Sequence, residues 1–177
     1  MAISLSSCAG PRPTGPLDRF EATLAKHSSA TAALGDWCVA EGLAAAPDIR
    51  ALPVVGDDRA ATAQVRQALE VGPGERLGYR HVRLVCGDVV LSVAHNWYVP
   101  ARLTPAMNLA LERSDAPFGR VTAPLGYVRE ERAPRRGRGD SCPVGTVLTK
   151  GAVLRLPDGR PIALVVECYT GEILPPQ

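Results

Sequence analysis

Residues 79–100 read YRHVRLVCGDVVLSVAHNWYVP, and this stretch decides the fold. Two runs rich in Val and Leu flank Gly87-Asp88, which predicts two antiparallel strands joined by a tight turn. Because side chains alternate across a strand, His81 and Arg83 share one face and Arg80 lies on the other. Guanidinium groups on a strand in the middle of a sheet need partners, and a carboxylate ligand is one candidate.

The size and charge of the chain restrict the classes of protein to which it can belong. Its 177 residues suit one domain with a sizeable core, and the net charge of +2 favours neither nucleic acid nor an anionic membrane as a partner. No apolar run approaches the roughly 18 to 20 residues that a membrane span requires. We expect a monomeric, single domain over residues 17–177 that takes a small-molecule partner.

The first 16 residues are rich in Gly and Pro, which predicts a disordered or processed tail. The segment Met1 to Leu5 is too short and uncharged for a secretory signal, so we expect a cytoplasmic protein. An alternative remains open, because Leu5-Ser6-Ser7-Cys8 resembles the end of a bacterial lipoprotein signal. In that case the protein is exported or anchored by a lipid in the periplasm.

The five cysteines form no CxxC pair, which argues against a zinc site and against a dense disulfide framework. Cys38, Cys86 and Cys168 lie in periodic apolar segments and are predicted to be small core residues. Cys8 and Cys142 fall in predicted loops.

Four helices are predicted from apolar spacing and from capping residues. The first has Leu17, Phe20 and Leu24 at helical spacing and stops near His27. The second is capped by Ser28 or Ser29 and buries Leu34, Trp37 and Cys38. The third is capped by Asp57 or Asp58 and has Ala61, Val65 and Leu69 as apolar positions, and the fourth starts at Thr104-Pro105.

The remaining strands complete an α+β pattern. Residues 49–55 predict an edge strand, since Pro53 excludes them from the centre of a sheet. Residues 147–156 and 162–170 predict a second hairpin, and residues 121–129 a further strand. The arginine-rich segment 130–143 is either a solvated, mobile loop or a basic flap that draws in an anionic ligand.

Glu167 is the one carboxylate in the apolar last strand, where it shares a face with Ala163, Val165 and Tyr169. Such a group must be paired, exposed on an open face, or shifted in pKa within a pocket. Composition alone gives equal support to Glu167 as a residue on the sheet surface and to Glu167 as a residue of a functional site.

Three blocks of the chain resemble the chorismate lyase family. They are the central hairpin with its Cys-Gly-Asp turn, the Ala116–Arg120 loop (APFGR), which is similar to the family's Pro-Leu-Gly-Arg, and the closing hairpin from Leu154 to Tyr169. Ser29-Ala30-Thr31 is also similar to the family's Ser-Met-Thr at the start of an early helix. The resemblance covers roughly residues 29 to 172.

The resemblance implies an α+β fold with an antiparallel sheet of about six strands, helices packed on it, and flap-like loops over an internal ligand cavity. The family converts chorismate to 4-hydroxybenzoate and pyruvate in ubiquinone biosynthesis, without a metal or an organic cofactor. Carried over, the backbone amides of Ala30 and Phe118, with the adjacent Gly119, hold the ring carboxylate. Glu167 meets the ring hydroxyl and, as a catalytic carboxylate, assists removal of the proton.

The family's arginine on the first hairpin strand has no direct match. An ungapped alignment through Cys86 puts His81 at its position, with Arg80 and Arg83 on either side. Arg83 shares a face with His81, so we expect Arg83 to supply the catalytic cation, whereas Arg80 would serve only if a bulge shifted the strand. Histidine lacks the bidentate fork of arginine, which changes the expected affinity or substrate.

Three functions follow from these observations. The first is a chorismate pyruvate-lyase. The second is a non-catalytic binding protein for a small aromatic carboxylate, because the same fold resembles the effector-binding domains of GntR-type regulators; residues 1–78 contain no basic recognition helix, which lowers the case for a complete regulator. The third is a lyase-like enzyme acting on a related substrate.

Overall fold

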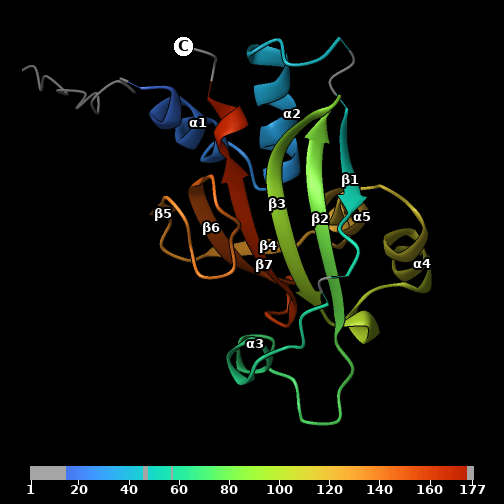
Figure 1. Ribbon diagram of the computed structural model, residues 1–177. Coiled ribbons are helices and arrows are strands. Elements are labelled where there is room, and N and C mark those ends of the chain that lie inside the picture. Colours follow the sequence, from blue (N-terminus) through green and yellow to red (C-terminus); the bar gives the residue numbers. More distant parts are fainter. Residues whose placement is uncertain (1–14, 46–47, 57, 175–177) are drawn as a thin grey trace, which may run out of the picture.

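An antiparallel sheet forms the centre of the computed structural model, which describes residues 15–45, 48–56 and 58–174. Its strands are β1 (Ile49–Pro53), β2 (Gly78–Cys86), β3 (Val89–Tyr98), β4 (Val128–Glu131), β5 (Arg135–Arg136), β6 (Thr146–Arg155) and β7 (Pro161–Thr170). The order across the sheet is β1-β2-β3-β7-β6-β4, and the two-residue β5 pairs with β6 (Figure 1). The predicted α+β class and the antiparallel sheet of about six strands are confirmed.

The central hairpin forms as predicted. Gly87 has a φ of 56°, a conformation that glycine adopts without steric cost, and it turns β2 into β3. Across the sheet Val82 pairs with Ala94, and Ala94 pairs with Glu167. Because directly paired residues of antiparallel strands point to the same side, these three side chains share one face.

The helices surround the sheet on both sides. They are α1 (Pro16–Leu24), α2 (Ala30–Ala40), α3 (Ala63–Ala68), α4 (Pro105–Arg113) and α5 (Phe118–Thr122), with 3₁₀ turns η1 (Pro100–Arg102), η2 (Ala123–Leu125) and η3 (Gly171–Ile173). Within the described ranges, every helix is too short or too polar to cross a bilayer.

The predicted caps of α2, α3 and α4 can be compared with the structure, and Ser29 is the N-cap residue of α2, as one of the two predicted alternatives. Thr104 caps α4 as predicted, since its hydroxyl accepts a hydrogen bond from Met107 N at 3.2 Å. The cap of α3 is Thr62 and not Asp58, because the Thr62 hydroxyl accepts from Val65 N at 3.3 Å. Asp57, the other predicted cap, lies outside the described residues.

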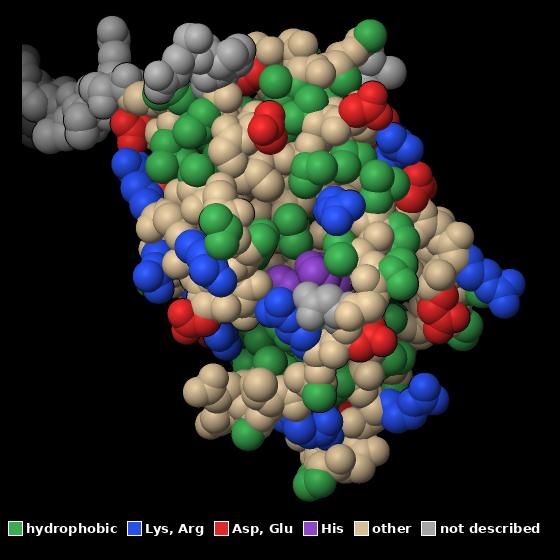
Figure 2. All heavy atoms as spheres, viewed as in Figure 1, with side chains coloured by type: hydrophobic (Ala, Val, Ile, Leu, Met, Phe, Trp, Pro, Cys, Tyr) green, Lys and Arg blue, Asp and Glu red, His purple; other side chains and the backbone are tan. Residues whose placement is uncertain are grey.

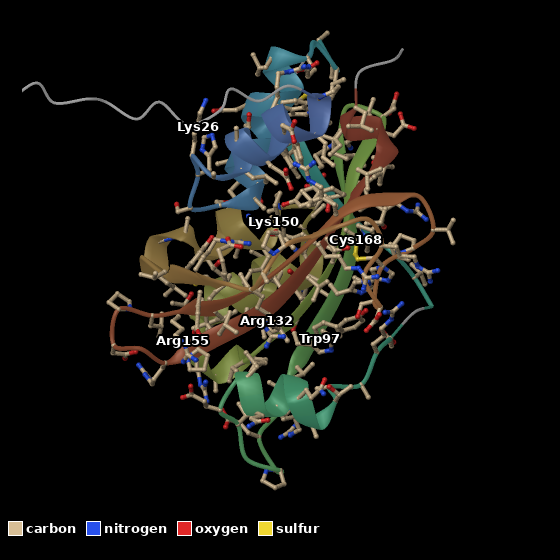
Figure 3. All side chains as sticks on the ribbon, turned by 90° about the vertical axis from the view of Figure 1, so that its left-hand side faces the viewer. Lys26, Trp97, Arg132, Lys150, Arg155 and Cys168 are labelled. Carbon is tan, nitrogen blue, oxygen red and sulfur yellow. A yellow bond between two sulfur atoms is a disulfide. The ribbon has the colours of Figure 1, made fainter. Side chains whose placement is uncertain are left out.

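The helices bury three apolar clusters. On the face that carries Glu167, α1 and α2 cover one end of the sheet and α4 and α5 the other, while α3 covers part of the opposite face (Figure 1). Trp97 lies directly over α3 (Figure 3). The sheet face between α2 and α5 is therefore enclosed at both ends, which leaves room for a cavity in its middle.

The segment 121–129 differs from its prediction. It contains the end of α5, the turn η2 and only the first two residues of β4. The helix forms because Phe118 and Thr122 are buried against the sheet, and the Thr122 hydroxyl donates to Phe118 O at 2.9 Å. Packing of these side chains outweighs the local strand preference of Val121 and Thr122.

The arginine-rich segment 130–143 lies along the sheet and makes defined contacts. Arg136 of β5 forms ion pairs with Asp18 and Glu21 of α1. Arg138 Nε donates to Cys142 O at 2.7 Å. Most of the segment's residues are exposed, as predicted for a surface loop, but the Arg136 side chain attaches it to α1 and backbone pairing attaches it to β6.

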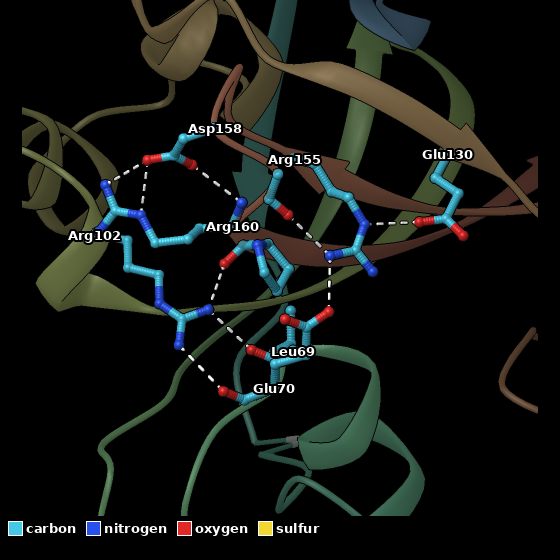
Figure 4. Close-up of polar contacts among 9 residues, drawn as sticks. Leu69, Glu70, Arg102, Glu130, Arg155, Asp158 and Arg160 are labelled. Atoms are coloured by element: carbon cyan, nitrogen blue, oxygen red, sulfur yellow. Dashed lines mark hydrogen bonds and ion pairs between the residues drawn. The ribbon is translucent and has the colours of Figure 1, made fainter.

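Two arginines attach α3 to the far end of the sheet (Figure 4). Arg102 donates to the carbonyl oxygens of Leu69 at 2.8 Å and Pro161 at 2.6 Å. Arg155 donates to the carboxylates of Glu70 at 2.8 Å and Glu130 at 2.7 Å. Arg102 thus satisfies carbonyl groups at the helix end, which would otherwise need water as a partner, and Arg155 holds the Glu70 side chain.

Two disulfides join distant parts of the chain. Cys38–Cys86 links α2 to β2 with Cα atoms 6.3 Å apart, and Cys142–Cys168 links the 137–145 loop to β7 with Cα atoms 5.5 Å apart (Figure 3). The predicted burial of Cys38, Cys86 and Cys168 is confirmed. The sequence left open whether any cysteines pair, and helix and loop packing brings each of these three to a partner. Cys8 lies outside the described residues.

Replacing Cys142 and Cys168 together by Ala should lower the free energy of unfolding by roughly 3 kcal/mol, because the disulfide closes a loop of about 26 residues in the unfolded chain. The Cys38→Ala/Cys86→Ala variant should lose somewhat more unfolding free energy, because this disulfide closes a longer loop, with 48 residues separating the two cysteines in the sequence. Guanidinium unfolding measures both values. Peptide mapping without reductant is the control, and free thiols at Cys142 or Cys168 would contradict the assignment.

Candidate functional site

A small, partly enclosed cavity lies between the sheet, the N-terminus of α2 and the start of α5. Its volume is about 30 Å³, which is room for one or two water molecules. The lining residues are Ser29, Ala30, Thr31, Val82, Leu84, Ala94, Asn96, Phe118, Gly119, Tyr127, Arg129, Leu154, Val165 and Glu167. They come from α2, α5 and the strands β2, β3, β4, β6 and β7, so the whole fold contributes to this enclosure.

A buried ion pair forms one side of the cavity. Arg129 of β4 donates to both oxygens of Glu167, from Nη2 to Oε2 at 3.1 Å and from Nη1 to Oε1 at 3.4 Å. The two side chains are 9% and 8% exposed. Tyr169 Oη also donates to Glu167 Oε2 at 3.0 Å, and Arg129 Nε donates to Glu131 at 2.9 Å. Both charged groups therefore have directed partners.

The electrostatics keep Arg129 charged and Tyr169 protonated. Burial acts to lower the pKa of Arg129, but attraction by Glu167 and the hydrogen bond to Glu131 raise it above its ordinary value. Burial raises the pKa of Tyr169 well above its usual range, and the negative charge of Glu167 raises it further. Tyr169 is thus a hydrogen-bond donor and not a base at neutral pH.

Three hydroxyl groups meet at Gly119 on another side of the cavity. A Cβ atom at Gly119 would lie 2.9 Å from Ser29 Oγ, 3.3 Å from Tyr127 Oη and 3.4 Å from Thr31 Oγ1. Ser29 is the N-cap of α2, yet its side chain makes no cap hydrogen bond and instead contacts Tyr127. Burial raises the pKa of Tyr127, which keeps its hydroxyl protonated.

These hydroxyls lie beside the first turn of α2, an 11-residue helix that begins at Ala30. The N–H groups of a first helical turn have no partner within the helix and carry the positive end of its dipole. Together with the hydroxyls they form a group of donors suited to a carboxylate. The glycine at position 119 leaves the space in which such a group can approach.

The remaining walls are mainly apolar. They consist of Val82, Leu84, Ala94, Phe118, Leu154 and Val165, with Asn96 as a polar exception. Such walls suit a ring or a short aliphatic body between two polar ends. In the described part of the chain, no three His, Cys, Asp or Glu side chains are grouped so that they could hold a metal ion.

Four of the residues predicted from the sequence line this one cavity: Ala30, Phe118, Gly119 and Glu167. Their distances along the chain are large, so only the fold brings them together. Their roles toward a ligand remain predictions.

The predicted position of His81 and Arg83 is wrong. Both were expected to face Glu167, but the pairing of Val82 with Ala94 and of Ala94 with Glu167 puts Val82 on the cavity side. His81 and Arg83 therefore point to the opposite face of the sheet, where they line a different pocket.

Arg80 lies on the Glu167 face without the bulge that was expected to be necessary, since the register of β2 and β3 is regular until the shift between Leu84 and Val85. Its guanidinium does not reach the cavity. It donates to Ser114 O at 3.0 Å and to Ala116 O at 2.9 Å, and so holds the loop that leads into α5. Burial lowers the pKa of Arg80.

Four lining side chains were not predicted from the sequence: Arg129, Tyr127, Ser29 and Thr31. Arg129 stands in a short strand of charged residues, VREE, where nothing in the local pattern marks a buried position. Only the pairing of β4 with β6 brings it beside Glu167. Ser29 and Thr31 lie within the Ser-Ala-Thr motif, but this motif predicted a role for the backbone amide of Ala30 and none for the two hydroxyl groups.

Comparisons with known proteins agree with this fold. The chain is 40% identical to the uncharacterized protein y4mC of Sinorhizobium fredii, in an alignment that covers 89% of this chain and 75% of the relative. No model of a protein family matches it.

Solved structures give the fold class. The effector domain of PhnF from Mycobacterium smegmatis aligns with a TM-score of 0.60 and 16% identity over 82% of this chain and 90% of that domain. The longer PhnF structure aligns with a TM-score of 0.60 and 15% identity, over 84% of this chain and 66% of that one. The possible transcriptional regulator YydK from Bacillus subtilis aligns with a TM-score of 0.51 and 16% identity, over 75% of this chain and 64% of that one. The chain thus spans less than two thirds of YydK and about that share of PhnF. These alignments agree with the predicted fold class, an α+β fold with a large antiparallel sheet and helices packed on it, as in the chorismate lyase-like fold.

Replacing Arg129 by Leu should lower the free energy of unfolding by roughly 3 kcal/mol, because Glu167 then stays buried without its cation. The double variant Arg129→Leu/Glu167→Leu should be more stable than the single one, since no uncompensated charge remains. Urea unfolding measures both. Arg113→Leu on exposed α4 is the control and should change stability by about 0.5 kcal/mol or less. A double variant less stable than the single one would refute the interpretation.

Proposed function

The chain belongs to the family of the Sinorhizobium fredii protein y4mC, and from that premise and its cavity we propose that it is a non-catalytic binding domain for a small aromatic carboxylate. The observation that supports this proposal is the mutual neutralisation of Arg129 and Glu167 inside a cavity of the effector-domain fold.

Charge is the first argument for binding without turnover. Chorismate is a dianion, and its elimination needs cationic groups to orient it and to stabilise charge as the ether leaves. The single arginine of the cavity lining has its charge offset by Glu167, and Arg80, His81 and Arg83 are directed elsewhere. A nearly neutral cavity with one group of neutral donors suits a monoanion better.

The arrangement of polar groups defines the pose that we propose. The carboxylate of the ligand lies at the hydroxyl cluster of Ser29, Thr31 and Tyr127, beside the backbone of Ala30 and Phe118. Its ring lies between the apolar walls, and a ring hydroxyl meets Glu167 on the far side. Because the cavity holds only about 30 Å³, binding requires α5 or the start of α2 to move outward.

The similarity to an effector domain supports the same proposal. Effector domain is the term that the PhnF structure carries, and the alignment covers 90% of it. Carried over to this chain, ligand binding serves as a signal and the ligand leaves unchanged. The movement of α5 or α2 that admits the ligand is then the event that a partner would detect.

The lyase is the second candidate, favoured by Ala30, Phe118, Gly119 and Glu167 lining one cavity as the family resemblance implies. In that case Glu167 assists removal of the ring proton. The ion pair with Arg129 opposes this role, because a Glu167 carboxylate that took up the ring proton would leave the buried Arg129 without its counter-charge.

The disulfides bear on the compartment that we propose. Disulfides such as Cys38–Cys86 and Cys142–Cys168 persist in oxidising compartments and are rare in the cytoplasm. They favour the exported alternative over the cytoplasmic location expected from the sequence. Chorismate is a cytoplasmic metabolite, so export also favours binding over the lyase reaction.

Purified protein should gain thermal stability from 4-hydroxybenzoate, by a few degrees in Tm when the ligand is at about 100 times Kd. Gly119→Ala should abolish this gain, because the new methyl group fills the space among the three hydroxyls. Gly35→Ala is the matched control, since its Cβ meets no atom within 4 Å. Differential scanning fluorimetry measures the shift.

The same protein should leave chorismate intact, which an enzymatic assay for pyruvate checks. Pyruvate released in many turnovers, and lost in Glu167→Gln, would replace the binding proposal by the lyase. A Tm that no small carboxylate changes would refute the proposed class of ligand.

A further inference from the structure

A second, larger pocket lies on the opposite face of the sheet. Its volume is about 340 Å³, within the range of small-molecule sites. The lining residues are Val54, Arg59, His81, Arg83, Val93, His95, Arg138, Asp140, Ser141, Cys142 and Pro143. Figure 2 shows this face, with histidine at the bottom of a hollow and Lys or Arg side chains beside it. We call it the histidine-face pocket.

Its floor is rigid because it is built on the two central strands. His81 of β2 is paired with His95 of β3, and their rings stack with centroids 4.2 Å apart. Tyr79 Oη lies 2.8 Å from His95 Nδ1. Arg83, two residues along β2, projects from the same face beside its partner Val93.

Its roof is the segment from Arg138 to Pro143, and three contacts hold it in place. The Cys142–Cys168 disulfide fixes it to β7, and Arg138 Nε donates to Cys142 O at 2.7 Å. Arg59 Nη1 donates to Ser141 O at 3.2 Å, which joins the roof to the chain between β1 and α3. The roof therefore presents Arg138 at a defined position over the floor.

The charges of the lining favour an anion. Arg83 and Arg138 each bring a guanidinium group to the lining, and Asp140 is the one carboxylate among the lining residues that the structure describes; Arg59 also lines the pocket but is held by other contacts. Arg83 and Arg138 make no ion pair with any carboxylate of the described ranges. Positive groups around a hollow with low-dielectric walls focus a field that attracts anions.

We propose that the histidine-face pocket binds a small phosphate-bearing anion, at a site independent of the Glu167 cavity. Arg83 approaches from the floor and Arg138 from the roof, so their N–H groups reach the space from different directions. A planar carboxylate is satisfied by one guanidinium fork, whereas a tetrahedral phosphate accepts hydrogen bonds on several sides. The surplus of guanidinium groups over carboxylates also suits its second negative charge.

Isothermal titration with inorganic phosphate tests the proposal on the oxidised, full-length protein. Arg83→Leu should weaken phosphate binding by about tenfold or more, since one charge-assisted contact is lost. Asp140→Asn should strengthen it by several-fold, because a repelling carboxylate in the lining becomes neutral. A gain of affinity cannot result from damage to the fold. Arg113→Leu, which makes the same charge change on exposed α4, is the control and should bind as the unmodified protein does.

Further probes separate the sources of phosphate and the two sites. Glycerol 3-phosphate binding tighter than inorganic phosphate would identify a phosphate monoester, and the reverse order would identify free phosphate; either supports the proposal. Acetate binding as tightly as phosphate would overturn the proposed class, and phosphate binding that Arg83→Leu leaves unchanged would overturn the site. Gly119→Ala should retain phosphate binding, so failure of the Glu167 cavity and failure of this pocket give different results.

Discussion

The register between β3 and β7 is the constraint on which the functional architecture depends. It aligns Ala94 with Glu167, and through the hairpin it aligns Val82 with both. Since side chains alternate along each strand, this single alignment sends Glu167 to the helix-covered face and His81 and Arg83 to the other. A slip of β7 by one residue would move Glu167 to the face that carries His81 and Arg83. Backbone pairing of β7 with β3 on one side and with β6 on the other holds this register.

The buried pair of Arg129 and Glu167 acts on this framework as a second constraint. Burying either charge alone is costly, and the cost is offset only while both are held in bidentate geometry. The pair ties the edge strand β4 to the central strand β7 across β6. Such a pair is weak evidence for added stability, but it restricts how the sheet edge and the cavity wall can be arranged. The cavity thereby keeps one polar side among apolar walls.

Local signals in the sequence predicted most of the fold. The turn at Gly87, the Thr104 cap and the closing hairpin act over a few residues, and each formed where expected. Pairing between distant segments leaves no local signal, so the partner of Glu167 and the disulfides were missed. Ala30, Phe118 and Gly119, which were predicted from two short sequence motifs, do line the same cavity as Glu167. The prediction for Arg83 was wrong because alternation defines two faces but does not say which one meets Glu167.

The two pockets are joined by backbone and not by side chains. Glu167 and Cys168 are neighbours on β7, yet one carries the polar side of the cavity and the other anchors the roof of the histidine-face pocket. A change at one site can reach the other only by shifting the strand itself, and β7 is held by hydrogen bonds to both β3 and β6. Movement on ligand binding is therefore easier in α2, α5 and the roof segment than in the sheet. The fold thus permits two ligand sites whose mobile parts lie on opposite faces of one rigid layer.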